Sequence, residues 1–450
     1  MKKIALILCV VALAMMTAAP AFAVSSDMVD FEGSLRVRAK MNVHQLLAEE
    51  TAGAPDATSS FMDQRFRLQT RFRPTDFLTA TLRFDALERV LGTAVDPAMS
   101  GDPETNIEFE HAYMTVTTGV GKFDVGRMSG FAWGTLFADN EGPADRIKYT
   151  LPIGNLYVIA IIQKNAELDA MDNRYTDSDS DTYYLAGIYK MENLTCGLLS
   201  AMTMGKTASD NPIATFNFPN AVPFTSKTYA LLPYFKGSTG PVRYQGEIVY
   251  QFGNAMEFDR NVYAVPNAIA DVDQDSLAWN LEFGYDVAPF TFEIGYAFMS
   301  GDGRDANGVD TDPTKNNSAA GPGDDWEKLW ILTSTSQDTE NTLGGMGNLT
   351  RGNTARQGAK VLYLGAGITP MENLSMKLLF GTSDAEDPDA NVSQDHGEEY
   401  DLFVNYQIYD NLSYEFIAAY LDAGDFWQQG NANMKIENAI SVYNKLELKF

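Results

Sequence analysis

Polar and apolar side chains alternate along many stretches of this chain. Between residues 34 and 41 every second side chain is polar or basic, and those between them are apolar. Residues 65–73 repeat the pattern, with arginine at four of the five polar positions. A helix would scatter these arginines around its circumference, whereas a β-strand places all of them on one face. The pattern therefore predicts strands with one polar and one apolar face.

The same alternation predicts about eighteen strands over the chain. Their approximate ranges are 30–41, 62–73, 77–88, 106–118, 122–128, 144–151, 155–164, 182–190, 194–204, 226–236, 242–253, 276–286, 290–300, 358–368, 373–382, 398–409, 411–421 and 438–450. We expect about nine to eleven residues in each, the length of a tilted membrane strand. The alternation slips near His111, and residues 155–164 are apolar on both faces.

The connections between these strands alternate between short and long. Short turns fall near residues 74–76, 119–121, 152–154, 191–193, 237–241, 287–289, 370–373 and 410–411. A similar turn sequence, with an acidic residue, Asn and Leu, begins at Met191, Met371 and Tyr409. Every other connection is longer and polar. Outer-membrane barrels have short periplasmic turns and long extracellular loops. The predicted fold class is all-β: a transmembrane antiparallel up-and-down β-barrel of about 18 strands, within a range of about 16–18, with both termini periplasmic.

The first residues have the pattern of an export signal. Lys2 and Lys3 precede an apolar run from Ile4 to Met16, and Ala21-Phe22-Ala23 supplies small residues for a peptidase. This predicts a cleaved signal peptide over 1–23 and a barrel over 24–450, with the longest loop at about 301–357. The alternative is a membrane anchor, for which the apolar run is short.

Charge and rare residues exclude several functions. The chain has 60 acidic and 33 basic residues, a formal net charge of −27, which does not attract nucleic acid. Beyond the predicted signal peptide Cys196 has no cysteine partner, and there is no C-x-x-C-H haem motif. The histidines His44, His111 and His396 lie in no recognisable nucleophile arrangement, so we expect no enzyme activity.

At the C-terminal end, Leu446, Leu448 and Phe450 alternate with charged residues. Here the sequence resembles bacterial outer-membrane porins, whose last strand ends in Phe. The resemblance implies that the barrel-assembly machinery reads Phe450 and that outer-membrane lipid and lipopolysaccharide surround the protein; a homotrimer and a monomer both stay open. The segment from Gly126-Arg127 through Trp133-Gly134 to Asp145-Arg146-Ile147 is similar to a stretch of porin and alginate-export-like barrels.

The resemblance implies a water-filled channel for passive diffusion of ions and small hydrophilic solutes. At about eighteen strands, side chains no longer fill the interior of a barrel. Three alternatives stay open: a substrate-specific channel, a polysaccharide exporter, and a structural barrel or a sleeve around an electron-transfer partner.

Eight basic residues on the first three strands form what we call the basic face. They are Arg36, Arg38, Lys40, Arg65, Arg67, Arg71, Arg73 and Arg83. In hydrocarbon each would cost about 2–4 kcal/mol at the midplane, so we expect them to line the lumen. An opposing acidic surface would balance them, and its candidates are Glu247, Glu282, Glu293, Asp401 and Glu415. Such a pair of surfaces would orient solutes and tune ion selectivity; the alternative is that the arginines only stabilise the barrel.

Two loops contain further candidate sites. The third long connection, about 129–143, is a candidate constriction loop with Phe131, Trp133, Asp139 and Glu141; alternatively it turns outward and its aromatics join the interfacial girdle. Asp271, Asp273 and Asp275 have part of the spacing of a Ca²⁺-binding loop, but Ser276 replaces its glycine. We therefore expect no resident cofactor and at most loosely bound Ca²⁺. The loop at 301–357, with Trp326 and Trp330, would cap the pore, bind a partner or mediate oligomer contacts.

Overall fold

The computed structural model describes residues 28–45, 47, 58–92, 107–130, 132–140, 142–167, 179–207, 224–258, 270–319, 322–323, 325–333 and 355–450. The predicted signal peptide lies outside this range. In the described residues no helix is long and apolar enough to cross a membrane.

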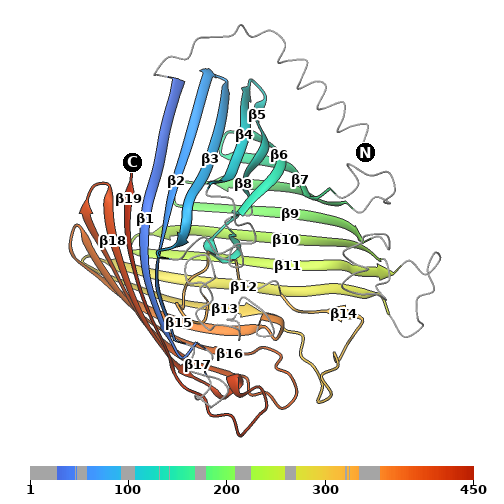
Figure 1. Ribbon diagram of the computed structural model, residues 1–450. Coiled ribbons are helices and arrows are strands. Elements are labelled where there is room, and N and C mark those ends of the chain that lie inside the picture. Colours follow the sequence, from blue (N-terminus) through green and yellow to red (C-terminus); the bar gives the residue numbers. More distant parts are fainter. Residues whose placement is uncertain are drawn as a thin grey trace.

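A single antiparallel sheet closes on itself (Figure 1). Apart from the short β14, each strand pairs with the next along the chain, and β1 pairs with β19. Within the described part of the chain, eighteen strands form the wall: β1(Val29–Val43), β2(Ser59–Thr75), β3(Leu78–Val90), β4(Ile107–Thr118), β5(Gly121–Gly130), β6(Gly142–Ile153), β7(Leu156–Ala166), β8(Ser180–Lys190), β9(Leu194–Thr207), β10(Phe224–Thr239), β11(Val242–Phe258), β12(Val272–Val287), β13(Phe290–Met299), β15(Ala359–Met371), β16(Leu374–Asp384), β17(Asp395–Tyr409), β18(Leu412–Ala423) and β19(Ala439–Lys449). The two-residue β14(Lys315–Asn316) adds parallel to β12. The predicted fold class and strand number are confirmed.

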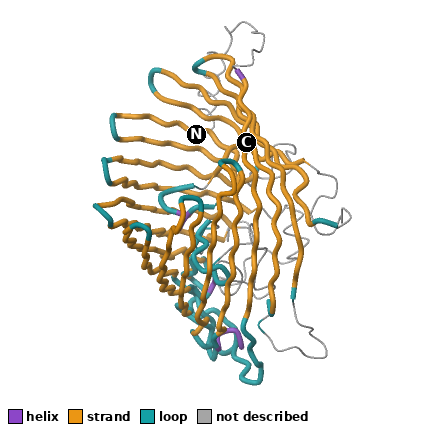
Figure 2. Tube along the Cα trace, turned by 90° about the vertical axis from the view of Figure 1, so that its left-hand side faces the viewer, coloured by secondary structure: helices purple, strands orange, loops and turns teal. Residues whose placement is uncertain are grey.

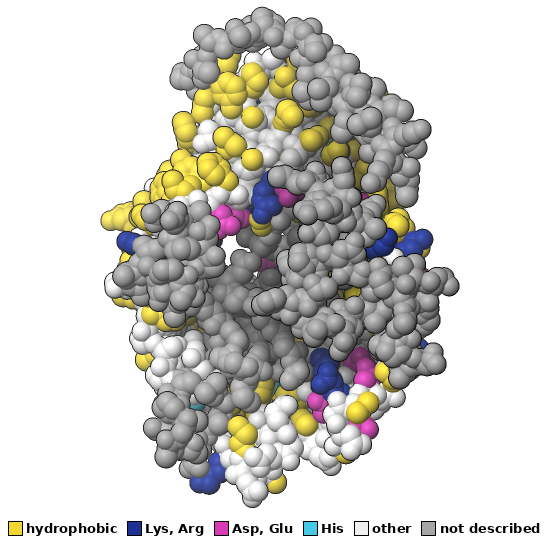
Figure 3. All heavy atoms as spheres, turned by 45° about the vertical axis from the view of Figure 1, so that its right-hand side comes forward, with side chains coloured by type: hydrophobic (Ala, Val, Ile, Leu, Met, Phe, Trp, Pro, Cys, Tyr) yellow, Lys and Arg dark blue, Asp and Glu magenta, His cyan; other side chains and the backbone are white. Residues whose placement is uncertain are grey.

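The predicted faces are also present. Along β1 the side chains of Arg36, Arg38 and Lys40 are buried, whereas Leu35 and Met41, which flank this run, are about two-fifths exposed on the outside. In a barrel the exposed apolar side chains face lipid, and the polar side chains face the interior. Figure 3 shows apolar side chains gathered on the outside of the strands.

One end of the barrel has short turns, and the other has longer connections with the two short helices η2(Leu136–Ala138) and η4(Asp425–Gln428) (Figure 2). The similar turn sequences beginning at Met191, Met371 and Tyr409 each join neighbouring antiparallel strands, as predicted. The slip in alternation near His111 is a bulge, because the β3–β4 register shifts between Arg83 and Phe84, the residues that pair with His111 and Phe109.

Twelve of the eighteen described wall strands are longer than predicted, whereas β5, β7, β8, β13, β16 and β19 have the expected ten or eleven residues. β2 and β11 have 17 residues each and β12 has 16, against the expected nine to eleven. The expectation counted only the residues needed to cross a bilayer. Hydrogen bonding between strands continues beyond that length, because polar residues such as Asp273 and Asp275 pair equally well in water.

The first and last strands meet closely at Gly33. The Gly33 N–H donates to the Phe450 carbonyl oxygen at 2.7 Å, and the Phe450 N–H donates back at 3.0 Å. The Phe450 ring stacks on Phe66, with 6.1 Å between centroids. A Cβ at Gly33 would lie 2.8 Å from a ring carbon of Phe450, so only glycine leaves room for that ring. Recognition of Phe450 by the assembly machinery stays a prediction.

Two loop segments lie inside the barrel, and we call them together the inner layer. It comprises residues 132–140 between β5 and β6, and residues 322–323 and 325–333 between β14 and β15. Their buried apolar side chains, including Phe137, Trp326 and Leu329, form one core with inward side chains of the wall. Figure 1 shows the teal η2 segment within the ring of strands.

Candidate functional site: the lumen

The basic face lies on the inner side of β1, β2 and β3. Arg36 and Arg65 pair directly across β1 and β2, and Arg67 lies opposite Ser34. Like charges in such positions repel one another. Glu88 of β3 relieves this repulsion, because its Oε1 atom lies 3.0 Å from Arg36 and 3.8 Å from Arg65.

Other carboxylates within the same patch neutralise the remaining cations. Asp63 lies 2.6 Å from Arg38 and 3.5 Å from Lys40, and Asp85 accepts two 2.7 Å hydrogen bonds from Arg67. Further pairs are Arg71 with Glu32, Arg73 with Asp30, and Arg83 with Glu110. The balancing carboxylates therefore sit on neighbouring strands of the same wall. The prediction that an acidic surface across the lumen balances the basic face is wrong, because nearer carboxylates do so.

The predicted acidic residues do lie on inward-facing positions, on strands β11, β12, β13, β17 and β18, but they are engaged there. Glu247, Glu282 and Asp401 are at most 5% exposed. Glu293 pairs with Lys377 at 3.1 Å, and Glu415 pairs with Lys445 at 2.7 Å. The inner layer covers Glu247, Glu282 and Asp401. These three residues therefore form no open acidic surface.

Residues 132–140 are anchored to the wall by Glu247. The backbone N–H and the hydroxyl of Thr135 both donate to Glu247 Oε2, at 2.9 and 2.6 Å. The Trp133 indole N–H donates to the Leu232 carbonyl oxygen at 2.9 Å, and its ring packs edge-on against Tyr234. The loop therefore turns inward, and the girdle interpretation is wrong. Asp139 accepts from the Trp133 N–H. Phe131 and Glu141 lie outside the described residues.

Residues 325–333 are held by two carboxyl groups of β17. Asp401 accepts the Trp330 N–H at 3.2 Å, and Glu399 accepts the N–H groups of Ile331 and Leu332 at 2.5 and 2.9 Å. Glu399 is completely buried and was not among the predicted residues. Its position two residues before Asp401, on the same strand face, is the signal that would have found it.

The two segments of the inner layer also contact each other. The Gly323 N–H donates to the Phe137 carbonyl oxygen at 2.7 Å, and the Asp325 N–H donates to that of Asp139 at 3.2 Å. The Phe137 and Trp326 rings meet edge to face, with 5.4 Å between centroids. This layer contacts the wall at β10–β12 and at β15–β19. The candidate passage is therefore the space between it and the basic face. In Figure 3, basic and acidic side chains lie along the upper edge of a hollow.

The candidate Ca²⁺ ligands do not converge. Asp273 and Asp275 lie within β12, and the Asp275 carboxylate accepts from the Tyr250 hydroxyl. Asp271 accepts the Phe258 N–H at 2.9 Å. Within the described ranges, no group of three or more His, Cys, Asp or Glu residues could hold a metal ion.

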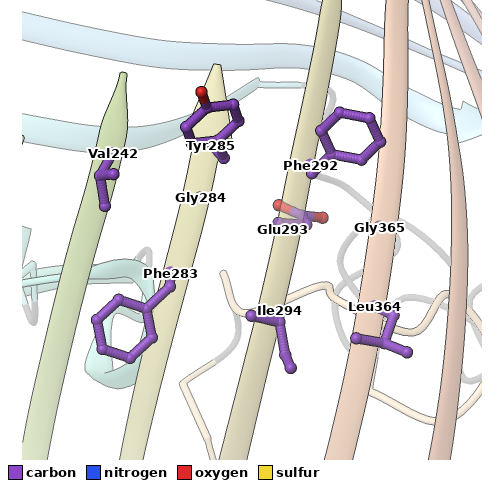
Figure 4. Close-up of a pocket in the computed structure, with 9 residues that line it drawn as sticks. All are labelled: Val242, Phe283, Gly284, Tyr285, Phe292, Glu293, Ile294, Leu364 and Gly365. Atoms are coloured by element: carbon purple, nitrogen blue, oxygen red, sulfur yellow. The ribbon is translucent and has the colours of Figure 1, made fainter. Parts of the chain in front are cut away.

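A cavity of about 530 Å³ lies on the outer side of β11–β15 (Figure 4). Its lining includes Phe283, Phe292 and Ile294, each nearly half exposed. Glu293 has the opposite strand parity and reaches Lys377 on the inner side. This concavity therefore belongs to the apolar outer surface and is not the passage.

No family model matches the sequence, and no curated protein matches it. Among solved structures, OccK8 (OprE) of Pseudomonas aeruginosa is similar, with a TM-score of 0.51 and 12% identity over 94% of this chain and 98% of that one. OccK11 (OpdR) of the same organism has a TM-score of 0.51 and 11% identity over 94% and 96%. The likeness is one of fold. The chain has the fold of a bacterial outer-membrane porin, the class that the sequence resemblance implied.

Proposed function

We propose that this protein is an outer-membrane porin that passes ions and small hydrophilic solutes by passive diffusion. The supporting observation is a lumen with two unlike sides: an ion-paired basic face on β1–β3, and an inner layer that covers much of the opposite wall. Charged side chains that face inward need water or partners, and a water-filled passage supplies the water. β1 begins and β19 ends at the side of the short turns, which we assign to the periplasm.

Planar-bilayer recording and liposome swelling test this function. The purified protein should give discrete conductance steps and should admit small sugars while excluding larger ones. Protein that assembles as a barrel but conducts no ions and admits no sugar would contradict the proposal. Removal of residues 132–140 should raise the conductance, because this loop occupies the lumen.

The inner layer favours a substrate-specific channel over a polysaccharide exporter or a sleeve for an electron-transfer partner. A polymer or a protein partner needs a wide lumen, whereas the tryptophans 326 and 330 are buried inside this one. Competition experiments distinguish these functions: a specific solute should reduce the ion current at low concentration, and a polymer of many sugars should not pass.

We infer that the protein is a channel and not an enzyme. His396 is fully buried and lies 2.9 Å from the Ser383 hydroxyl, so solvent and substrate do not reach this pair. His111 is 5% exposed and lies beside arginines of the basic face. We also propose loose Ca²⁺ binding, contact with lipopolysaccharide and a homotrimer. Calorimetric titration of the detergent-solubilised protein would test binding of Ca²⁺ and lipopolysaccharide. Native mass measurement would test the homotrimer.

The basic face would contribute to ion selectivity in such a channel. Replacing Arg36, Arg38, Arg65 and Arg67 by Gln leaves the neighbouring carboxylates in place, so the lumen becomes more negative. We expect the reversal potential in a salt gradient to shift toward cation selectivity. An unchanged potential would leave these arginines only their structural role.

A further inference from the structure

Lys328 brings a positive charge from an extracellular loop onto the barrel wall. Its Nζ atom lies 2.6 Å from Glu282 Oε2 and 3.9 Å from Glu293 Oε2. It also lies 5.3 Å from the centroid of the Tyr363 ring. A carboxylate pair beside an aromatic face is a strong environment for an ammonium group. Lys328 is the one cation among the inner layer's described residues.

The charges in this cluster balance, since Arg243, which also lies near both carboxylates, is paired with Asp286 at 2.6 Å. Glu282 and Glu293 supply two carboxylates, and Lys328 and Lys377 supply two ammonium groups, since Lys377 lies 3.1 Å from Glu293 Oε1. The Tyr363 hydroxyl donates to Glu282 at 2.8 Å but carries no charge. Removing Lys328 would thus leave an excess negative charge on the wall of the lumen.

The inner layer fixes Lys328 in this place. On its C-terminal side, the N–H groups of residues 330–332 bind Glu399 and Asp401. Leu329 packs against β16 so closely that a Cβ at Gly381 would lie 2.4 Å from it. On its N-terminal side, the Trp326 ring packs against Tyr363 and Phe137. A side chain held from both directions keeps its charge at a constant position.

We propose that Lys328 is a selectivity-determining residue, which neutralises Glu282 and Glu293 and so limits the preference of the channel for cations. This inference rests on the proposed channel function. An uncompensated charge acts over a Debye length of about 10 Å at 0.1 M salt, so it reaches ions in a passage narrowed by the inner layer. Lys328 thereby makes the selectivity depend on a loop, and not only on the strands.

The test is a charge-balance series in planar bilayers, with reversal potentials measured in a KCl gradient at mildly alkaline pH. Lys328→Gln should raise the cation-to-anion permeability ratio severalfold, and Glu282→Gln should lower it. The double variant restores the balance and should return close to the parent ratio. Lys190→Gln is the matched control, because Lys190 lies at the short-turn end of β8 against Tyr157, away from this cluster.

Three outcomes would overturn the inference: equal ratios in all variants, shifts of the same sign for Lys328→Gln and Glu282→Gln, or a double variant that shifts further than either. If Lys328→Gln does not assemble, Glu282→Gln alone still decides, since it must shift the ratio toward anions. A parent protein that conducts no ions would instead contradict the proposed channel function, so the two failures are distinguishable.

Discussion

Two walls of this barrel hold inward-facing charges in different ways. On β1–β3 side chains of adjacent strands neutralise one another, as with Arg67 and Asp85. On β12–β17 the carboxyl groups bind a loop, through its backbone N–H groups at Glu399 and through Lys328 at Glu282. The first wall is complete when the strands pair, whereas the second is complete only when the loop has folded inward.

The difference determines how much each wall depends on a single residue. Glu399 is completely buried, whereas the Arg71 and Glu32 side chains of the basic wall are 34% and 51% exposed. Water replaces a lost partner at an exposed site, but a buried group left without its partner carries the full cost of desolvation. We therefore expect the covered wall to be the more sensitive, and the predictions below test this order.

The largest effect should follow Glu399→Ala. Two buried N–H groups, of Ile331 and Leu332, would lose their acceptor, at a cost of about 2–5 kcal/mol. Residues 325–333 should then leave the wall, and single-channel conductance should rise. Glu399→Gln is the control, because it keeps an acceptor oxygen and should stay closer to the parent. Equal conductance in parent and Glu399→Ala would show that this segment does not narrow the passage.

An intermediate effect should follow Asp63→Asn in the basic wall. Asp63 neutralises Arg38 and Lys40, whose side chains are nearly inaccessible. Both cations have further interactions. We therefore expect the free energy of unfolding, measured by denaturant titration of the folded barrel, to fall by about 1–3 kcal/mol. The conductance should stay close to the parent value, because no segment of the inner layer depends on Asp63. If Asp63→Asn lowered the free energy of unfolding more than Glu399→Ala does, the basic wall would be the more sensitive of the two, contrary to our expectation.

The smallest effect should follow Arg71→Gln. The ion pair with Glu32 is well exposed, and such pairs contribute about 0–1 kcal/mol. The same denaturant titration should place this variant within about 1 kcal/mol of the parent. Raising the salt concentration should reduce the remaining difference in stability between this variant and the parent, since salt screens exposed charges. If Arg71→Gln lowered the free energy of unfolding as much as Asp63→Asn does, the exposure of an ion pair would not determine how much its loss destabilises the barrel.

Much of the barrel was predictable because its pattern is local. The alternation that places Arg36 and Leu35 on opposite faces is a property of adjacent residues, and so is its slip near His111. The turn at Met191 likewise depends on a few consecutive side chains. The carboxylate partners of the arginines were not predicted, because Glu88 and Asp85 reach them only through the register of β2 and β3.

By itself, the sequence determined the closed antiparallel barrel, the number of its strands, and which side chains face the lumen, because strand geometry repeats every two residues. It did not determine that residues 132–140 and 325–333 turn inward. That choice follows from contacts between distant residues, such as Thr135 with Glu247 and Leu332 with Glu399. Loop backbone carries no periodic signal, so its place is set by the buried acceptors that the assembled wall offers it.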